Sequence, residues 1–290
     1  MSQLIQMRQR IKAVQTIKKI THAMRLISMS VHSRLRTKKE TLLTYQDKLM
    51  SLLDTIRASG KVVHPFVESD LPTANPKVKS LIIIIGSHKG LCGNFNTQLF
   101  DHLIKEIEID SLRKQYDCIP IGRMAIEFAK EHNLKVLQQF RELSVATLQN
   151  LSLDISKSIF DFAKTYKTVT VYSNKSKSFF VQTPKTTTII PYKEETKTEN
   201  SNQQIYATWP HEPQEIFNHV LGQSLATHMY YILFESLLSE QAARFVSMDS
   251  STRNAKQILE DMQLEYNKRR QADITKELTD LAGALSAEKK

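Results

Sequence analysis

The sequence predicts an α/β protein: a long antiparallel coiled coil of N- and C-terminal helices plus a central Rossmann-like α/β domain. Three observations support this prediction. Residues 1–59 contain neither Gly nor Pro, apolar residues recur at helical spacing at both ends of the chain, and short strand-like and helix-like segments alternate between them. We therefore expect an N-terminal coiled-coil helix over 1–60, a central α/β domain over 75–192, a polar linker over 193–209 and a C-terminal coiled-coil helix over 210–290.

The N-terminal segment carries a sustained apolar stripe. Sixteen positions follow one another in steps of three and four, and thirteen of them are apolar. Their period lies near the 3.5 residues of a coiled-coil helix, and Gly60 and Pro65 would end the helix. At 1.5 Å per residue it would be roughly 80–90 Å long. The positions are 4, 7, 11, 14, 17, 21, 24, 28, 31, 35, 38, 42, 45, 49, 52 and 56.

The C-terminal segment has a stripe of the same kind. It follows Pro210 and Pro213, and its spacing predicts a helix of roughly 90–100 Å. Because the long middle segment can return the chain, we expect the two stripes to bury each other as an antiparallel pair. The second stripe runs through Ala242, Phe245, Met248, Thr252, Ala255, Leu259, Met262 and Tyr266, and continues through Ile274, Leu278, Leu281 and Leu285.

Between the two helices, segments of strand and helix character alternate, which is typical of a largely parallel sheet. The apolar run Val78–Ile85, closed by Gly86, predicts a buried strand, and Pro184 places its own strand at an edge of the sheet. Further strands are expected over Cys118–Ile121, Lys135–Leu137, Thr168–Ser173 and Phe179–Ile190, and helices over Phe95–Leu112, Arg123–His132 and Ala146–Tyr166.

Positive charge is concentrated at the N-terminal end. Of the net charge of +10, residues 1–40 carry +9, from ten Lys and Arg against the single acid Glu40. A segment of this charge indicates an acidic partner, which could be nucleic acid, an anionic membrane surface or an acidic protein ring. A solvated basic face is the alternative. Against a coiled coil that binds nucleic acid, no aromatic residues are interleaved with the basic ones.

A glycine-containing turn is the main candidate for chemistry. Gly86, Gly90 and Gly93 follow a predicted strand and precede a predicted helix, as phosphate-binding loops do. Their spacing, however, fits neither GxxxxGK[ST] nor GxGxxG. A tight strand-to-helix turn is therefore favoured over a nucleotide-binding enzyme.

The cysteines and histidines show no catalytic pattern. Cys92 and Cys118 are single thiols, and His88 and His132 are the histidines nearest to them in the sequence. No spacing typical of a metal site or a Cys–His pair results, so we expect buried thiols, no catalytic residues, no cofactor and no metal.

Motifs at both ends and in the middle of the chain resemble one family, the gamma subunit of F-type ATP synthase. Arg10–Val14 and Lys18–Met24 are similar to its first signature, and Gly90–Asn96 is similar to its GLCGxxN motif. The resemblance covers the whole chain, with the motifs in the family's order. It is closest at the C-terminal end, over Ser239–Arg244, Met248–Asp249, Thr252–Ala255 and Tyr266–Leu278.

The resemblance implies a central rotor shaft and not an enzyme. Such a chain would be a non-catalytic subunit of a proton- or sodium-translocating complex, present in one copy, with no cofactor. Its partners would be the alpha and beta subunits of a hexamer, the epsilon subunit and the c-ring, with no nucleic acid. It would contact the membrane only through the complex, as a peripheral membrane protein on the cytoplasmic face of the bacterial inner membrane. Rotation would couple ion flow to ATP synthesis or hydrolysis at the beta subunits.

The resemblance also implies six rotor–stator contacts. Met24 and Arg244 would contact the lever of a beta subunit, although Met24 also fits an ordinary stripe position. Arg270 and Gln271 would hydrogen-bond the beta catch loop, and both side chains offer several donors to carboxylates and carbonyls. Two positions depart from the family pattern, Val31 in place of a Lys and Phe245 in place of a Met. The six residues are Met24, Arg244, Arg270, Gln271, Thr275 and Glu277.

Overall fold

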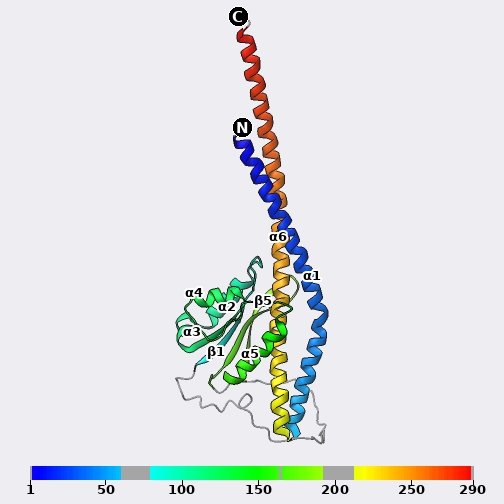
Figure 1. Cartoon of the computed structure of the whole chain (residues 1–290), viewed down its shortest axis with the longest axis vertical. Helices are drawn as coiled ribbons and strands as arrows, with labels where there is room; N and C mark the ends of the chain where they lie inside the picture. Colours follow the sequence, from blue (N-terminus) through cyan, green and yellow to red (C-terminus); the bar gives the residue numbers. More distant parts are fainter. Residues whose placement is uncertain (1, 60–78, 163–164, 192–211, 289–290) are drawn as a thin grey trace. The chain divides into compact units, whose positions relative to one another are not determined.

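The computed structural model describes residues 2–59, 79–162, 165–191 and 212–288. They form two long helices, one from each end of the chain, and a five-stranded sheet with shorter helices (Figure 1). The predicted linker 193–209 lies outside the described residues. The helices are α1 (Ser2–Ser59), α2 (Phe95–Glu106), α3 (Ile109–Gln115), α4 (Arg123–Glu131), α5 (Leu148–Phe162) and α6 (Pro213–Glu288), and the strands are β1 (Ser80–Ile85), β2 (Tyr116–Ile121), β3 (Lys135–Val136), β4 (Val169–Ser176) and β5 (Gln182–Ile190).

Both long helices form where the sequence predicts them. No Gly or Pro interrupts α1, so no position removes a backbone hydrogen bond or adds the entropy cost of glycine. α6 starts at Pro213, whose fixed φ suits a first helical turn that needs no N–H there. Gly222 is tolerated inside α6, where an added Cβ would make only an ordinary contact, 3.7 Å from the Phe160 ring. Across the described ranges, no helix has an apolar stretch that would span a bilayer.

The sheet is mixed, and β5 forms one of its edges. The strand order is β3-β2-β1-β4-β5. β1 pairs in parallel with β2 and β4, and β2 with β3, whereas β5 runs antiparallel to β4. The last five residues of β1 are all buried, as expected for a strand covered on both faces. Pro184 lies in β5, which confirms the predicted edge position.

Each face of the sheet has its own apolar core, because side chains alternate along a strand. Ile82 and Ile84 of β1 pack with residues of α2, α3 and α4 on one face. Ile83 and Ile85 pack on the other face with residues of α1, α5 and α6. The long helices therefore pack against one face of the sheet as well as against each other.

One helix predicted by the sequence is in fact two. A single helix is predicted over Phe95–Leu112, but α2 ends at Glu106 and α3 begins at Ile109. Ile107 between them has an extended backbone, with φ −131° and ψ 115°. β-Branched residues are weak helix formers, and the break lets Ile107 and the buried Leu112 reach the same apolar cluster. Burial of these side chains outweighs helical continuity here.

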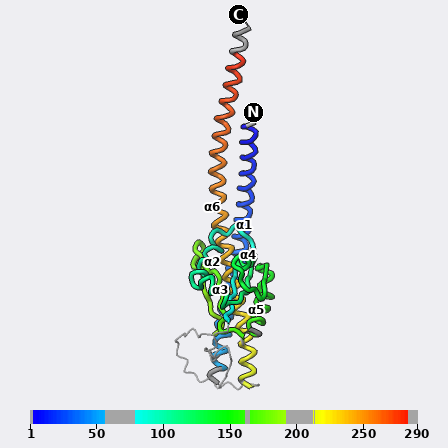
Figure 2. The backbone as a smooth tube through the Cα atoms, turned by 90° about the vertical axis from the view of Figure 1, so that its left-hand side faces the viewer, coloured from blue at the N-terminus to red at the C-terminus, as the bar shows by residue number. Residues whose placement is uncertain are grey.

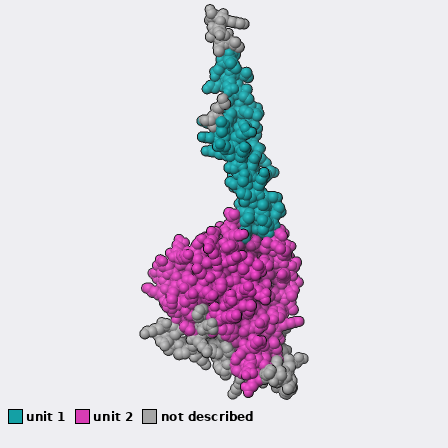
Figure 3. Space-filling view, viewed as in Figure 1, with its two compact units in different colours: residues 1–28, 244–290 teal, residues 29–243 magenta. Residues whose placement is uncertain are grey.

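The chain divides into two compact units (Figure 3): unit 1 is residues 1–28 and 244–290, and unit 2 is residues 29–243. In unit 2, α1 and α6 lie side by side (Figures 1 and 2). Lys39 Nζ lies 2.6 Å from Glu235 Oε1, and Gln46 Nε2 lies 2.8 Å from His228 Nδ1. The residue numbers of the contacting positions fall along α6 as they rise along α1, so the two helices run antiparallel, as predicted.

The buried stripe of α1 departs from the predicted one in four places. The sequence predicts Ile17, Lys38, Tyr45 and Leu52 on the buried face, but all four are exposed, whereas the adjoining Leu53 is buried. The predicted positions between and after them, such as Ser28, Leu35 and Ile56, are buried as expected, so each shift is local. Steps of three and four can alternate in either order at the same average of 3.5 residues, so the spacing alone does not decide between the two sets. The less exposed positions are 18, 39, 46 and 53 in place of 17, 38, 45 and 52.

Candidate functional site

The candidate site is the helix pair of unit 1, which holds all six residues that the resemblance assigns. Met24 lies on α1, and the other five lie on α6. At 1.5 Å per residue, Arg244 and Arg270 are about 39 Å apart along α6. The six residues therefore form two groups at different levels of the helix pair and not one cluster.

Polar contacts fix the register of the pair near the first group. Arg25 Nη1 lies 2.6 Å from Asp249 Oδ1, and Arg253 binds the other oxygen of the same carboxylate. Hydrogen bonding from Arg25 outweighs partial burial and, with the charge of Arg253, lowers the pKa of Asp249. The hydroxyl oxygens of Thr21 and Thr252 are 2.9 Å apart. Each contact requires one alignment of the two helices, so together they oppose sliding.

The two residues of the first group differ in accessibility. Met24 is half-buried, consistent with a stripe position that still presents part of its side chain. Arg244 is 4% exposed. A buried guanidinium needs partners within the chain, so an approaching protein would reach only the edge of Arg244. Its role as a contact stays a prediction.

The second group, which begins with Arg270, lies on the part of α6 that extends beyond the N-terminal end of α1. Arg269 Nη1 lies 3.8 Å from Met7 Sδ, close to the start of α1. α6 continues to Glu288, so its last turns extend past the N-terminal end of α1 (Figure 2). The Thr275 hydroxyl donates to the Gln271 carbonyl at 2.9 Å, a bond within the helix. All four residues of this group are exposed: Arg270, Gln271, Thr275 and Glu277.

Large apolar side chains are exposed along the same helix pair. Ten of them, between 40% and 62% exposed, lie on only two helices of unit 1. Apolar exposure on this scale suits contact with another molecule. The ten residues are Ile5, Ile17, Ile20, Leu26, Ile27, Ile258, Leu264, Ile274, Leu278 and Leu281.

This apolar surface differs from the prediction. Ile274, Leu278 and Leu281 belong to the stripe that was expected to be buried, but they are exposed, because α6 extends past the start of α1. Ile5, Ile20, Leu26 and Ile27 do not fit the stripe, and apolar residues on the outer face of a helix pair indicate a second contact surface. The site therefore combines basic and apolar character.

The glycine-containing turn is closed on itself. The Ser87 N–H donates to Asn96 Oδ1 at 2.9 Å, and Asn96 Nδ2 donates to Ser87 Oγ at 2.8 Å and contacts Cys92 Sγ at 3.3 Å. An added Cβ on Gly86 would lie 2.9 Å from the Ala125 nitrogen, so close packing requires glycine there. The polar groups of Ser87 and Asn96 thus bond within the turn itself, which agrees with the interpretation of this segment as a tight strand-to-helix turn.

The second cysteine adjoins a buried ionic cluster with a structural role. Asp117 accepts hydrogen bonds from the Tyr166 hydroxyl at 2.7 Å, Lys79 Nζ at 3.0 Å and Lys135 Nζ at 3.2 Å. Burial, followed by the Asp117 charge, raises the pKa of the Cys118 thiol to about 12. A thiol with such a pKa is unreactive near neutral pH.

His88 and His132 make local contacts. His88 Nδ1 lies 3.0 Å from the Arg141 carbonyl oxygen, and His132 Nδ1 lies 3.0 Å from that of Phe128. Among the residues that the structure describes, no group of three or more His, Cys, Asp or Glu could hold a metal ion.

Solved structures share this fold. A chain in the structure of the Euglena gracilis mitochondrial ATP synthase OSCP/F1/c-ring superposes with a TM-score of 0.68 at 14% identity, covering 99% of this chain and 94% of its own. A chain in the central stalk and c-ring structure of the Tetrahymena thermophila enzyme superposes with a TM-score of 0.59 at 19% identity, covering 80% and 98%. At these identities the likeness concerns the fold.

Sequence relatives cover the whole chain. The ATP synthase gamma chain of Paramagnetospirillum magneticum is 32% identical over 300 residues, which span 99% of this chain and 100% of the relative. That of Fusobacterium nucleatum is 29% identical, over 97% and 98%. A family model described as ATP synthase matches residues 3–287. With the fold, the motifs and these matches in agreement, the chain belongs to the ATP synthase gamma chain family.

Proposed function

We propose that this chain is the central rotor shaft of an F-type ATP synthase. In this role it couples rotation of the c-ring to ATP synthesis, or hydrolysis, at the beta subunits of an alpha/beta hexamer, without catalysing a reaction itself. The observation that carries the proposal is the helix pair of unit 1. It combines a register fixed by polar contacts with exposed apolar side chains, in a chain of the gamma family.

A shaft must resist twisting, and the helix pair has the means to do so. α1 has no glycine or proline hinge. If one helix slid along the other, it would break the Arg25–Asp249 and Thr21–Thr252 contacts together. A torque applied to one helix is therefore shared by both.

Two kinds of side chain on unit 1 suit two tasks. The exposed apolar residues make contacts without directional preference, so their energy changes little as the shaft turns inside a partner. Arg270 and Gln271 make directional hydrogen bonds and would hold particular angular positions. Met24, Arg244, Thr275 and Glu277 are proposed as further contacts with the beta subunits.

The remaining partners follow from the same role. The alpha and beta subunits would surround unit 1, and the basic N-terminal segment would face acidic surface of the hexamer. The epsilon subunit and the c-ring would bind unit 2, which would place the chain at the cytoplasmic face of the bacterial inner membrane as a peripheral subunit. Protons or sodium ions would drive the c-ring. The domain boundaries 1–60, 75–192, 193–209 and 210–290 are part of this proposal.

Assembly tests the proposed function. The purified chain is expected to hydrolyse no ATP, and with matching alpha and beta subunits it should form an active hexamer that contains one copy, since a hexamer has one axis. Native mass spectrometry and an ATPase assay measure both properties. ATP hydrolysis by the chain alone, or two or more copies per hexamer, would contradict the rotor role.

The double substitution R270A/Q271A tests the proposed catch contacts. We expect it to lower ATP-driven turnover of the assembled complex about tenfold, because several directional hydrogen bonds disappear. The matched control is K256A/Q257A, on exposed positions of the same helix. The Lys256–Glu260 pair is exposed and adds little stability. Equal losses in the two variants would remove the assignment of Arg270 and Gln271.

A further inference from the structure

In unit 2, the face of β4 and β5 that packs on α6 changes from apolar to polar. Val171 belongs to the apolar core, but Ser173 and Lys175 follow on the same face of β4, since side chains alternate along a strand. Lys185 lies directly opposite Ser173, and Thr187 lies opposite Val171. Lys175 and Lys185 are exposed, so water solvates them, whereas Ser173 is buried and its hydroxyl needs a partner.

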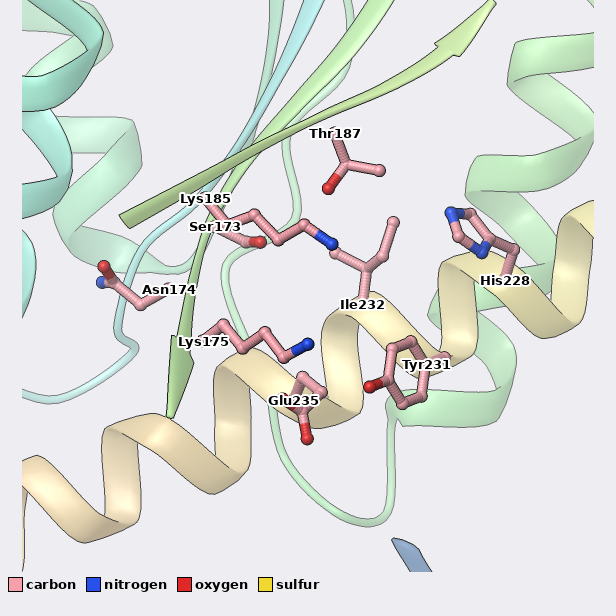
Figure 4. Close-up of a pocket in the computed structure, with 9 residues that line it drawn as sticks. All are labelled: Ser173, Asn174, Lys175, Lys185, Thr187, His228, Tyr231, Ile232 and Glu235. Atoms are coloured by element: carbon pink, nitrogen blue, oxygen red, sulfur yellow. The ribbon is translucent and has the colours of Figure 1, made fainter. Parts of the chain in front are cut away.

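A small cavity, partly open to solvent, lies at this polar stretch. It has a volume of about 30 Å³ and is lined by four of these residues, together with Tyr231 and Glu235 of α6. Figure 4 shows the ammonium groups of Lys175 and Lys185 and the Tyr231 hydroxyl directed into the space between strands and helix. A water molecule needs about 10–15 Å³ by this measure, so the cavity has room for one small ion.

The groups that line the cavity have unused hydrogen-bonding capacity. Ser173 is 5% exposed. Its hydroxyl, the Thr187 hydroxyl and the ammonium groups of Lys175 and Lys185 make no hydrogen bond or ion pair with any residue that the structure describes. Burial, followed by the charge of Glu235, raises the pKa of Tyr231 to about 12, so its phenol stays a donor. Five donors therefore face one small space.

The charges around the cavity select an anion. Among the residues that the structure describes, Glu235 is the only acid that lines it, and its Oε1 is ion-paired with Lys39 Nζ at 2.6 Å. Lys175 and Lys185 therefore leave the cavity with excess positive charge. The other carboxylate oxygen, Glu235 Oε2, is buried without a hydrogen-bond partner among the described residues. It can accept a hydrogen bond, so the favoured anion is one that also carries a proton.

We propose that this cavity binds a small protonated oxyanion, for which inorganic phosphate is the probe. The two lysines would neutralise its charge, Ser173 and Tyr231 would donate to its oxygens, and Glu235 would accept from its P–OH group. The bound anion would bridge β4, β5 and α6. This inference does not depend on the rotor role.

Calorimetric titration of the full chain with phosphate, at constant ionic strength, tests the site. We expect saturable binding, and K175Q/K185Q should weaken it about tenfold or more. Both lysines are exposed, so the variant should fold. The control K114Q/K130Q removes the same charge from exposed positions on α3 and α4 and should bind as the unchanged chain does. No saturable heat with phosphate, or equal weakening in both variants, would overturn the site.

Sulfate has no proton to donate at neutral pH, so it tests the role of Glu235. The unchanged chain should prefer phosphate over sulfate, and E235Q should bind the two anions about equally, because the amide removes repulsion and can donate. If the unchanged chain shows no preference for phosphate, the assigned role of Glu235 is wrong. If E235Q does not fold, the unchanged chain and K175Q/K185Q, each titrated with both anions, still decide the proposal.

Discussion

Replacing Leu278 and Leu281 by aspartate is expected to leave the free chain folded but to prevent its assembly with alpha and beta subunits. Both side chains are largely exposed in the free chain, so the change removes little packing there. In the proposed complex the hexamer encloses this end of α6. Two carboxylates would then be buried without partners, which costs several kcal/mol each. Circular dichroism of the free chain and native mass spectrometry of the mixture measure the two effects.

The matched control places the same charges on unit 2. Val145 and Leu153 are also exposed apolar residues, and V145D/L153D makes the same chemical change in residues that do not belong to unit 1. This variant should assemble with alpha and beta subunits as the unchanged chain does. If L278D/L281D assembles equally well, the exposed apolar residues at the end of α6 are not an interface with the hexamer.

Replacing Asp117 by asparagine is expected to lower the free energy of unfolding by about 2–3 kcal/mol at pH 7. The Asp117 carboxylate is buried and accepts hydrogen bonds from Tyr166, Lys79 and Lys135. An amide can still accept from Tyr166, but it carries no charge to pair with the two ammonium groups. Urea unfolding of the free chain measures the loss.

The free energies of unfolding of D117N and the unchanged chain should differ less at low pH. Burial acts to raise the pKa of Asp117, but hydrogen bonds from Tyr166, Lys79 and Lys135 outweigh it, so the pKa in the folded chain is lowered. A lowered folded pKa stabilises the protein above the unfolded pKa, about 4, and this contribution is lost as pH falls through the folded pKa.

The difference in the free energy of unfolding between D117N and the unchanged chain should therefore become smaller as the pH falls from 5 to about 3. The control D154N, at an exposed position of α5, should change stability by less than about 0.5 kcal/mol at either pH. A difference for D117N that stays constant with pH would show that the Asp117 charge does not stabilise the fold.

Much of the fold could be predicted because it depends on local patterns. The long helices follow from the absence of Gly and Pro and from apolar spacing, and the edge position of β5 follows from Pro184. The break at Ile107 and the one-residue shift of the buried stripe could not be predicted. Both depend on which side chains a particular tertiary neighbour buries, and local propensity does not contain that information.

The candidate site was only partly predictable. The resemblance pointed to residues of α6 such as Arg270, and the charge count pointed to the N-terminal segment. The register set by Arg25 and Asp249, the burial of Arg244 and the exposed apolar surface needed the pairing of two distant segments. Coiled-coil periodicity limits which faces meet, but many registers satisfy it.

Single-molecule rotation tests the rotor role most directly. A cysteine introduced at the exposed Lys114 of α3 can carry a probe, because Cys92 and Cys118 are buried and would not compete. With the alpha/beta hexamer fixed to a surface, ATP should turn the probe continuously in one direction. A probe that stays still while the same complexes hydrolyse ATP would contradict the account.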